Sequence, residues 1–298
     1  MNRPLRSYLF APGDNERLLA KMLGAGADAV VVDLEDGVRP ERKAVARGVG
    51  AQFLRASTDS FIPIYVRINT VGGDLWRDDL AAVVSPALHG VRLAKAESAD
   101  EIDAVDCELS ALEQQAGMPV GATRIVPTIE SAAGVLALAQ IVLRPRVEAL
   151  CFGAVDFLAD IRAEADAALT ASLHALSHLV LASRVAGIWA PVASAHTQLD
   201  DEDGLRSTCE VYRRLGFFGR SVIHPKQLAV VHHAFTPTDE DVERARDVVT
   251  AFSEQAAAHR GTAVTAGGKF VDEAVVRHAR GVLALAESLK VQAKEGSR

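Results

Sequence analysis

The sequence has little of several features that mark particular classes of protein. It has three cysteines in 298 residues, at positions 107, 151 and 209, with no C-x-x-C pair, which excludes a disulfide scaffold and indicates a reducing compartment. No apolar run approaches the roughly 18 residues of a membrane helix. Aspartate and glutamate (39) outnumber lysine and arginine (32), which argues against general nucleic-acid binding. The first residues show no signal-peptide pattern, so we expect a cytoplasmic protein with no membrane contact.

What the sequence does have is an alternation of short apolar runs with amphipathic stretches. With 49% hydrophobic and 24% charged residues, it is typical of a folded soluble protein. The predicted strands are residues 7–11, 29–34, 62–68, 91–93, 124–129, 149–152, 187–192 and 219–223. A short helical stretch around residues 18–23 follows the first strand, and further predicted helices lie at about 42–55, 76–84, 99–115, 132–142, 170–185, 201–215 and 226–234.

Eight strand–helix units in order indicate a parallel sheet closed into a (β/α)8 TIM barrel. The competing fold, a doubly wound open sheet, would carry a G-x-G-x-x-G motif after its first strand, and none is present there. Residues 236–298 lie beyond the eight units of a standard barrel. Their pattern predicts a helix over 238–259, a glycine-containing loop over 260–269 and a last helix over about 271–291. We therefore expect a barrel domain, 1–235, and a C-terminal extension, 236–298.

Polar residues gather where the predicted strands end, which is where a barrel of this kind carries its active site. They are Asp14, Asn15, Asp33, Glu35, Asp36, Arg67, Asn69, Lys95, Glu97, Glu130, Asp156 and His224. Basic and acidic side chains would thus converge around one axis, in a pattern that the outer faces of the helices do not need.

Glu130 and Asp156 form the most distinctive pair in this set. Each follows an apolar run directly, so two carboxylates from adjacent strand ends could share one hard divalent cation, with water or substrate oxygens completing its coordination. The alternative for Asp156 is a helix N-cap. No H-x-H, H-E-x-x-H or Cys/His cluster supports a zinc site.

Arg67 ends an apolar strand, and an arginine there needs an anionic partner. That partner is either a substrate or a structural carboxylate, Glu35 or Asp36. Lys95 leaves the same two alternatives open. Serine or cysteine nucleophiles are not favoured, because none has a convincing base nearby.

Several of these residues belong to motifs that occur along nearly the whole chain. The motifs are RSYLFAPG at 6–13, GADAVVVDLEDGV at 26–38, VRIN at 66–69, LAKAES at 93–98, IES at 129–131, FGAVD at 152–156, IHP at 223–225 and GKFVD at 268–272. This ordered set resembles the citrate lyase β-subunit-like proteins, which belong with the malyl-CoA and citramalyl-CoA lyases in the HpcH/HpaI aldolase group. Two departures, LAK for the usual LPK and PVAS at 191–194 for Pro-x-Asp-Gly, leave the acyl-CoA substrate open.

The resemblance implies a TIM barrel that holds Mg2+, or Mn2+, through Glu130 and Asp156. It implies that Arg67 binds substrate and that a C-terminal lid, contributed by a neighbouring subunit, brings an acid/base aspartate that matches Asp272. Such a lid implies a homotrimer or homohexamer. The residues alone leave a helix N-cap as the other role of Asp272. The expected substrate-binding set is Arg67, Glu130, Glu35, Asp36 and Lys95. In this set, Glu35 and Asp36 would orient metal-bound waters.

The expected reaction is a retro-Claisen cleavage of a malyl-CoA or citramalyl-CoA type of thioester to a 2-oxo acid and acetyl-CoA. Arg67 would stabilise the thioester enolate, and Asp272 would protonate it. The alternatives are the β subunit of a multi-subunit citrate lyase, an aldolase acting without CoA, a malate synthase or malyl-CoA thioesterase, and a catalytically inactive ligand-binding paralogue. Candidates for attracting the phosphates of CoA are Arg3, Arg6, Arg39, Arg42 and Lys43.

Overall fold

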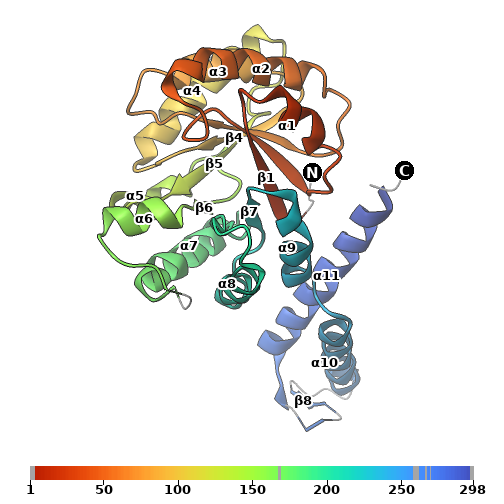
Figure 1. The fold of residues 1–298 in the computed structure, drawn as a ribbon. Coiled ribbons are helices and arrows are strands. Elements are labelled where there is room, and N and C mark those ends of the chain that lie inside the picture. Colours follow the sequence, from red (N-terminus) through yellow and green to blue (C-terminus); the bar gives the residue numbers. More distant parts are fainter. Residues whose placement is uncertain (1–3, 167–168, 258–261, 266, 269, 296–298) are drawn as a thin grey trace. The chain divides into compact units, whose positions relative to one another are not determined.

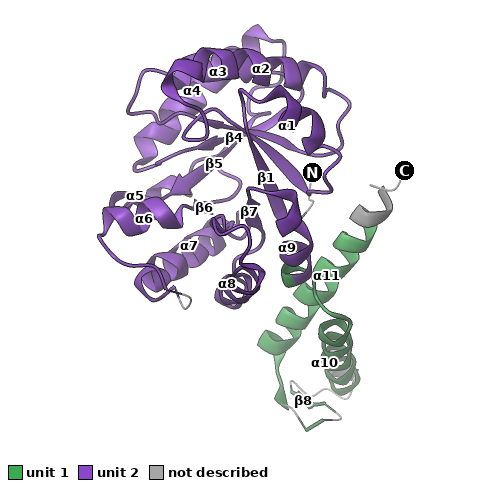
Figure 2. Cartoon of the chain, in the orientation of Figure 1, with its two compact units in different colours: residues 1–4, 234–298 green, residues 5–233 purple. Residues whose placement is uncertain are grey.

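The chain folds into two compact units. The structure is a computed structural model that describes residues 4–166, 169–257, 262–265, 267–268 and 270–295. The larger unit is Leu5–His233, and the smaller one comprises Met1–Pro4 and Ala234–Arg298 (Figure 2).

The larger unit has an α/β fold built on a curled parallel sheet. Within the described residues, seven strands form this sheet in the order β6-β5-β4-β3-β2-β1-β7, with helices on its outer side (Figure 1). The strands are β1 (Ser7–Pro12), β2 (Ala29–Asp33), β3 (Ile64–Ile68), β4 (Leu88–Leu93), β5 (Arg124–Ile129), β6 (Cys151–Phe152) and β7 (Arg220–Val222). Every residue of β2 is buried, as the continuous apolar run predicts for a strand covered on both faces.

The seventh predicted strand, residues 187–192, is not a regular strand. In its place, Val192 and Ala193 make isolated parallel bridges to Cys151 and Arg220, at the two edges of the sheet. The Val192 N–H donates to the Leu150 carbonyl (2.8 Å) and the Ala193 N–H to the Gly219 carbonyl (2.9 Å). Proline has no N–H, so Pro191 cannot extend this ladder as a donor. Residues 192 and 193 therefore link β6 and β7, but only over two residues.

The helices of the larger unit follow the predicted pattern with one addition. They are α1 (Glu16–Met22), α2 (Lys43–Arg55), α3 (Trp76–Val83), α4 (Ala99–Gln115), α5 (Ala132–Ile141), α6 (Ala154–Asp160), α7 (Leu173–Ala186), α8 (Glu202–Leu215) and α9 (Leu228–Phe235), with 3-10 turns at Pro40–Arg42, Thr170–Ser172 and Pro225–Gln227. Local chemistry fixes their starts: Ser98 and Glu101 form a capping box at α4, and Ser131 caps α5. The additional helix is α6, directly after the short strand β6.

An apolar cluster fills the concave side of the sheet. Its members come from five strands, the segment just before β6 and the 192–193 bridge: Tyr8, Ala29, Val31, Tyr65, Val126, Ala149, Cys151 and Val192. The rings of Tyr8 and Tyr65 lie 5.6 Å apart between centroids. Because side chains from strands across the sheet contact one another, this cluster closes the interior and supports whatever lies at the carboxyl ends of the strands.

The smaller unit consists of two helices and a short hairpin. Helix α10 (Asp239–Ala257) and helix α11 (Glu273–Glu295) flank β8 (Ala263–Val264) and β9 (Phe270–Val271), which pair antiparallel. The prediction of a loop over 260–269 was therefore wrong for residues 263–264, which form β8, while positions 260, 261, 266 and 269 lie outside the described residues. No helix in the described chain is long and apolar enough to cross a membrane.

Candidate active site

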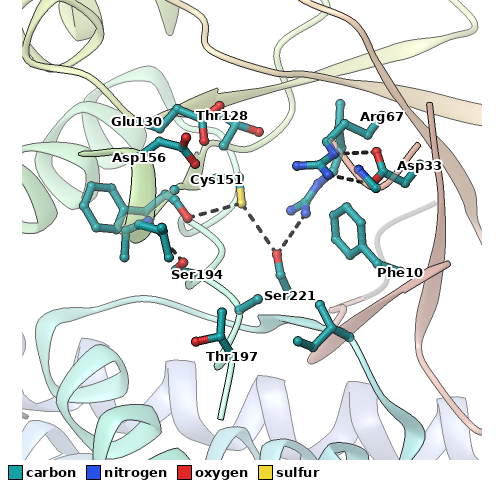
Figure 3. A pocket seen from close by; sticks show the side chains of 18 of the residues that line it. Phe10, Asp33, Arg67, Thr128, Glu130, Cys151, Asp156, Ser194, Thr197 and Ser221 are labelled. Atoms are coloured by element: carbon teal, nitrogen blue, oxygen red, sulfur yellow. Dashed lines mark hydrogen bonds and ion pairs between the residues drawn. The ribbon is translucent and has the colours of Figure 1, made fainter. Parts of the chain in front are cut away.

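A cavity of about 410 Å3 opens at the carboxyl ends of the strands of the larger unit. It is lined by Phe10, Ala11, Pro12, Asp33, Gly37, Arg67, Arg92, Thr128, Glu130, Cys151, Phe152, Gly153, Ala154, Val155, Asp156, Ser194, Ala195, Thr197, Ser221 and Ile223. Three of the predicted strand-end acids and Arg67 thus meet around one space (Figure 3).

The Glu130 and Asp156 side chains lie beside each other on one wall of this cavity (Figure 3). Glu130 follows β5 and is 7% exposed, and its Oε1 accepts a hydrogen bond from the Lys95 N–H at 2.7 Å. Burial and, to a smaller extent, the negative charges of Asp156 and Glu35 raise the pKa of Glu130 to about 7. The hydrogen bond from the Lys95 N–H lowers this pKa, but by less. Asp156 lies in the first turn of α6, whose N-cap residue is Gly153, so the N-cap alternative for Asp156 was wrong.

The absence of a side chain at position 153 makes room for the Glu130 carboxylate. A Cβ on Gly153 would lie 2.2 Å from Glu130 Oε2, far inside van der Waals contact. The Gly153 N–H donates to the Ile129 carbonyl (3.0 Å), and the Ala154 N–H donates to Ser194 Oγ (3.1 Å). These contacts tie the start of α6 to its neighbours and hold the two carboxylates on one wall.

The donor set at this wall fits Mg2+ better than a softer metal. Two hard carboxylates face the cavity, and the described residues contain no group of three or more His, Cys, Asp and Glu side chains that could enclose an ion. Mg2+ usually keeps several waters and takes one or two carboxylates together with substrate oxygens. Burial is the main cause of the raised pKa of Glu130, and the neighbouring charge of Asp156 adds to it; a bound cation would offset both effects. The assignment of Glu130 and Asp156 as metal ligands stays a prediction.

The opposite side of the cavity carries Asp33 and Arg67, which belong to a cluster of three acids and two bases. Arg67 Nε and Nη2 donate to the two oxygens of Asp33 at 2.7 and 2.6 Å, and Arg67 Nη1 lies 3.2 Å from Glu35 (Figure 3). Lys95 Nζ donates to Glu35 and, at 3.0 Å, to Asp36. Of the two carboxylates expected beside Arg67, the structure therefore shows Glu35 and not Asp36. The bidentate partner, Asp33, was in the strand-end set without an assigned role.

These contacts favour the charged forms of Arg67, Lys95 and Asp36. Burial alone would lower the pKa of Arg67, but its hydrogen bonds to Asp33 and the charges of Asp33 and Glu35 raise it above the ordinary value. The pKa of Lys95 is also raised, because its contacts with Glu35 and Asp36 outweigh the lowering effect of burial. The pKa of Asp36 is lowered, because its contact with Lys95 outweighs burial. Lys95 adopts a left-handed backbone conformation (φ 51°), which directs its N–H at Glu130.

The remaining predicted strand-end residues have local structural contacts. Asn69 donates to Asp79 and to the Leu34 carbonyl, and Asn15 caps α1. Asp14 pairs with Arg42, the Glu97 N–H donates to Glu101, and His224 Nδ1 accepts from the Lys226 N–H. None of these five is among the described residues that line the cavity.

Most of the basic residues expected to attract CoA phosphates are engaged in the fold. Arg6 pairs with Asp28 (2.8 Å), and Arg42 pairs with Asp14 (3.0 Å). Lys43 Nζ donates to the Leu34 and Glu35 carbonyls and to Asn69. Arg39 is exposed, and Arg3 lies outside the described residues. The role of these side chains toward CoA stays a prediction.

Asp272 belongs to the smaller unit. Its Oδ1 accepts a hydrogen bond from the Val275 N–H at 3.0 Å, at the start of α11, so it has the capping contact that the sequence suggested. The catalytic role of Asp272 stays a prediction.

Sequence reasoning missed several polar residues of the cavity, among them Arg92, Ser194 and Ser221. Arg92 and Ser221 lie within strands β4 and β7, and Ser194 follows the 192–193 bridge. An arginine between Val91 and Leu93 in a buried strand was the available signal, because a charged side chain in such a run needs a specific environment.

The sequence and the fold of this chain are similar to those of known proteins of one family. The sequence model of a family described as HpcH/HpaI aldolase/citrate lyase matches residues 6–225. The citrate lyase subunit beta of Haemophilus influenzae is 31% identical, over 95% of this chain and 97% of its own length. A (3S)-malyl-CoA thioesterase of Cereibacter sphaeroides is 32% identical, over 96% of each chain. The crystal structure of protein CitE from Mycobacterium tuberculosis in complex with magnesium, acetoacetate and coenzyme A matches with a TM-score of 0.77 and 28% identity, over 96% of this chain and 99% of that one.

Proposed function

Because the chain belongs to the HpcH/HpaI aldolase/citrate lyase family, a family of carbon–carbon lyases, we propose that it cleaves a malyl-CoA or citramalyl-CoA type of thioester to a 2-oxo acid and acetyl-CoA. The observation that carries the proposal is the carboxylate pair Glu130 and Asp156 on one wall of a cavity whose other side holds Arg67. Magnesium in the solved relative supports Mg2+ as the cofactor.

Glu130 and Asp156 would hold Mg2+, which when bound supplies Lewis acidity toward a substrate carboxylate and the neighbouring hydroxyl. The Lys95 N–H and the space left at Gly153 fix the orientation of the Glu130 carboxylate. Asp33 and Glu35 fix the Arg67 guanidinium, which keeps further N–H groups for the enolate oxygen that forms when the carbon–carbon bond breaks. Lys95 holds Glu35 and Asp36, which would orient water bound to Mg2+.

The enolate carbon then needs a proton, and the described lining of the cavity offers no free acid for it. Asp33 is bonded to Arg67, and Glu130 and Asp156 are assigned to the metal. We assign the proton transfer to Asp272 of a second copy of the chain, with residues 236–298 as a lid; the active enzyme is then a homo-oligomer, and we propose a homotrimer or homohexamer. The Asp272 cap uses Oδ1, which leaves Oδ2 for this role.

The direct test is a coupled assay on malyl-CoA and citramalyl-CoA with Mg2+ present and after chelation. Glu130→Gln and Asp156→Asn should abolish both turnover and Mg2+ binding, whereas Glu97→Gln, an exposed carboxylate near the same strand ends, should change neither. Turnover that persists after complete chelation, or Mg2+ affinity that survives both substitutions, would contradict the assignment.

Thioester hydrolysis is the second candidate, because a malyl-CoA thioesterase is similar over nearly the whole chain. The two activities differ in their products: cleavage releases a 2-oxo acid and keeps the thioester as acetyl-CoA, while hydrolysis releases free CoA thiol. Thiol release without oxo acid would favour the thioesterase. Copurification with a separate acyl-carrier subunit would instead favour the citrate lyase complex.

A further inference from the structure

The cavity contains a buried cation whose donors are only partly used. Arg92 lines the cavity and is 1% exposed to solvent. Its guanidinium carbon lies 4.8 Å from the centre of the Tyr8 ring and 5.2 Å from that of Phe10. Nη1 donates to Ser221 Oγ at 3.0 Å, while Nε and Nη2 have no hydrogen-bond partner among the described residues. Aromatic rings stabilise a cation only in part, so these donors are available to an anion.

The protein supplies no acid for this cation in the part of the chain that the structure describes: no carboxylate there forms an ion pair with Arg92. Arg67, the other arginine among the described lining residues, differs, because Asp33 and Glu35 contact its guanidinium. A buried guanidinium normally has an anion beside it. The charge of Arg92 is therefore the unmatched charge of the described cavity lining.

A thiol is joined to this cation through one hydroxyl group. Cys151 lines the cavity, and its Sγ lies 3.7 Å from Ser221 Oγ (Figure 3). Because Ser221 Oγ accepts from Arg92 Nη1, its own O–H can donate to the sulfur. The sulfur also lies 3.8 Å from the Phe152 carbonyl. The thiol thus faces a space that contains both a cation and a hydroxyl donor, which are the groups that would stabilise a negative charge on the sulfur or on an atom bound to it.

The other two cysteines lack this combination. Cys107 is exposed, and no cationic side chain bonds to it in the described structure. Cys209 is buried, with its Sγ 3.2 Å from Arg220 Nη1, but it is not among the residues that line the cavity. Of the three thiols, only that of Cys151 has both an open cavity and an unpaired cation beside it in the residues described. The chain therefore carries its own controls for the effects of exposure and of charge.

We propose that Cys151 is a site of oxidation by hydrogen peroxide, and that Arg92 and Ser221 stabilise the sulfenate that forms. The sulfur attacks one peroxide oxygen, an S–O bond forms and the O–O bond breaks. The leaving hydroxide takes the thiol proton and becomes water, so the sulfur is oxidised and the peroxide is reduced. The sulfenic acid gives its proton to solvent, and the sulfenate oxygen accepts hydrogen bonds from Arg92 and Ser221.

The oxidation would inhibit the enzyme, a consequence that rests on the proposed function. Cys151 pairs with Thr128, two residues before Glu130, so the new oxygen lies close to the Glu130–Asp156 wall. It takes up space in a cavity of about 410 Å3, and its charge offsets that of Arg92 and repels the carboxylate of the substrate. A dithiol reduces a sulfenate back to the thiol, so the inhibition is reversible.

The test measures the oxidation of each cysteine directly and needs no assay of lyase activity. The full chain is treated with hydrogen peroxide in Mg2+ buffer, sulfenic acid is trapped with dimedone, and the labelled peptides are quantified by mass spectrometry. Cys151 should be labelled about tenfold faster than Cys107 or Cys209, because only its product is both accessible and stabilised by a cation. Arg92→Met should remove this advantage, whereas Arg124→Met, which replaces an exposed arginine at the start of β5, should leave it unchanged.

Labelling of Cys151 no faster than that of Cys107 would overturn the proposal, and so would an advantage that survives Arg92→Met. Should that variant fail to fold, the comparison of the three cysteines in wild-type protein still decides, together with Ser221→Ala, which should slow the labelling of Cys151 several-fold.

Turnover separates this proposal from the proposed function. Peroxide should inactivate the wild-type enzyme and dithiothreitol should restore it, while Cys151→Ala should resist the same treatment. Undiminished turnover of wild-type enzyme that is fully oxidised at Cys151 would overturn the inhibition. A chain that cleaves none of the thioesters, yet is labelled at Cys151 in the expected way, would contradict the proposed function and leave the oxidation site supported.

Discussion

Lowering the pH should weaken Mg2+ binding, because a proton and the cation compete for Glu130. With a pKa of about 7 in the metal-free protein, Glu130 is mostly charged at pH 8 and mostly protonated at pH 6. Since the cation binds the carboxylate form, the apparent Kd for Mg2+ should be about tenfold higher at pH 6 than at pH 8, equivalent to about 1.4 kcal/mol. A glutamate with an ordinary pKa near 4.5 would produce almost no change over this range.

The same group links stability to pH with a defined sign. Its pKa is higher in the folded protein than in the unfolded chain, so its contribution is fully present below about pH 4.5 and is lost as the pH rises through about 7. The loss amounts to at most about 3 kcal/mol for this nearly buried side chain. Mg2+ should therefore raise Tm more at pH 8 than at pH 6.

Isothermal titration of metal-free protein with Mg2+ at pH 6, 7 and 8, with Tm measured in parallel, provides the assay. Glu97→Gln should reproduce the wild-type pH dependence, because this carboxylate is exposed and does not line the cavity. A Kd that is constant between pH 6 and pH 8 would refute the reasoning, because it would mean that Glu130 is already ionised or does not contact the ion.

Three further predictions follow from the geometry. Gly153→Ala should displace the adjacent metal carboxylate and weaken Mg2+ binding at least tenfold, or by more than about 1.4 kcal/mol, whereas Gly48→Ala, where an added Cβ meets nothing within 4 Å, should leave titrations unchanged. Asp272→Asn should stop turnover while preserving substrate binding, and mixing it with inactive Asp156→Asn should restore activity in mixed oligomers. No restoration in confirmed mixed oligomers would place the acid within one chain. Asp33→Asn should lower the free energy of unfolding by roughly 2 kcal/mol in urea, because it leaves the half-buried Arg67 short of its main partner; a change below about 1 kcal/mol would contradict that account.

Periodicity was sufficient to locate most of the scaffold. The helix predicted over 132–142 is α5 (Ala132–Ile141), and the fully apolar run at 29–34 became the buried strand β2. The run at 187–192 has comparable apolar character, yet its regular pairing is confined to residues 192 and 193. Strand length there depends on how two sheet edges meet, which local sequence does not encode.

The site was predictable where a polar residue directly follows a strand, and less so elsewhere. Glu130 and Asp156 were both identified by position, although Asp156 lies in helix α6, which was not predicted. Arg92 was missed, because which face of a strand is concave emerges only when the sheet curls. The pairing of Arg67 with Asp33 depends on strand register, since these residues are direct neighbours on β3 and β2.

Position 95 joins two parts of the cavity through chemically independent groups. The main-chain N–H of Lys95 meets Glu130, while its ammonium, at the end of a long flexible chain, meets Glu35 and Asp36. Any non-proline residue supplies the first contact, and glycine or asparagine would tolerate the left-handed backbone with less strain. A substitution at position 95 can therefore remove the positive charge beside Glu35 and Asp36 while the main-chain hydrogen bond to Glu130 remains. The charge of the acidic cluster and the geometry of the Glu130 carboxylate can thus change independently of each other.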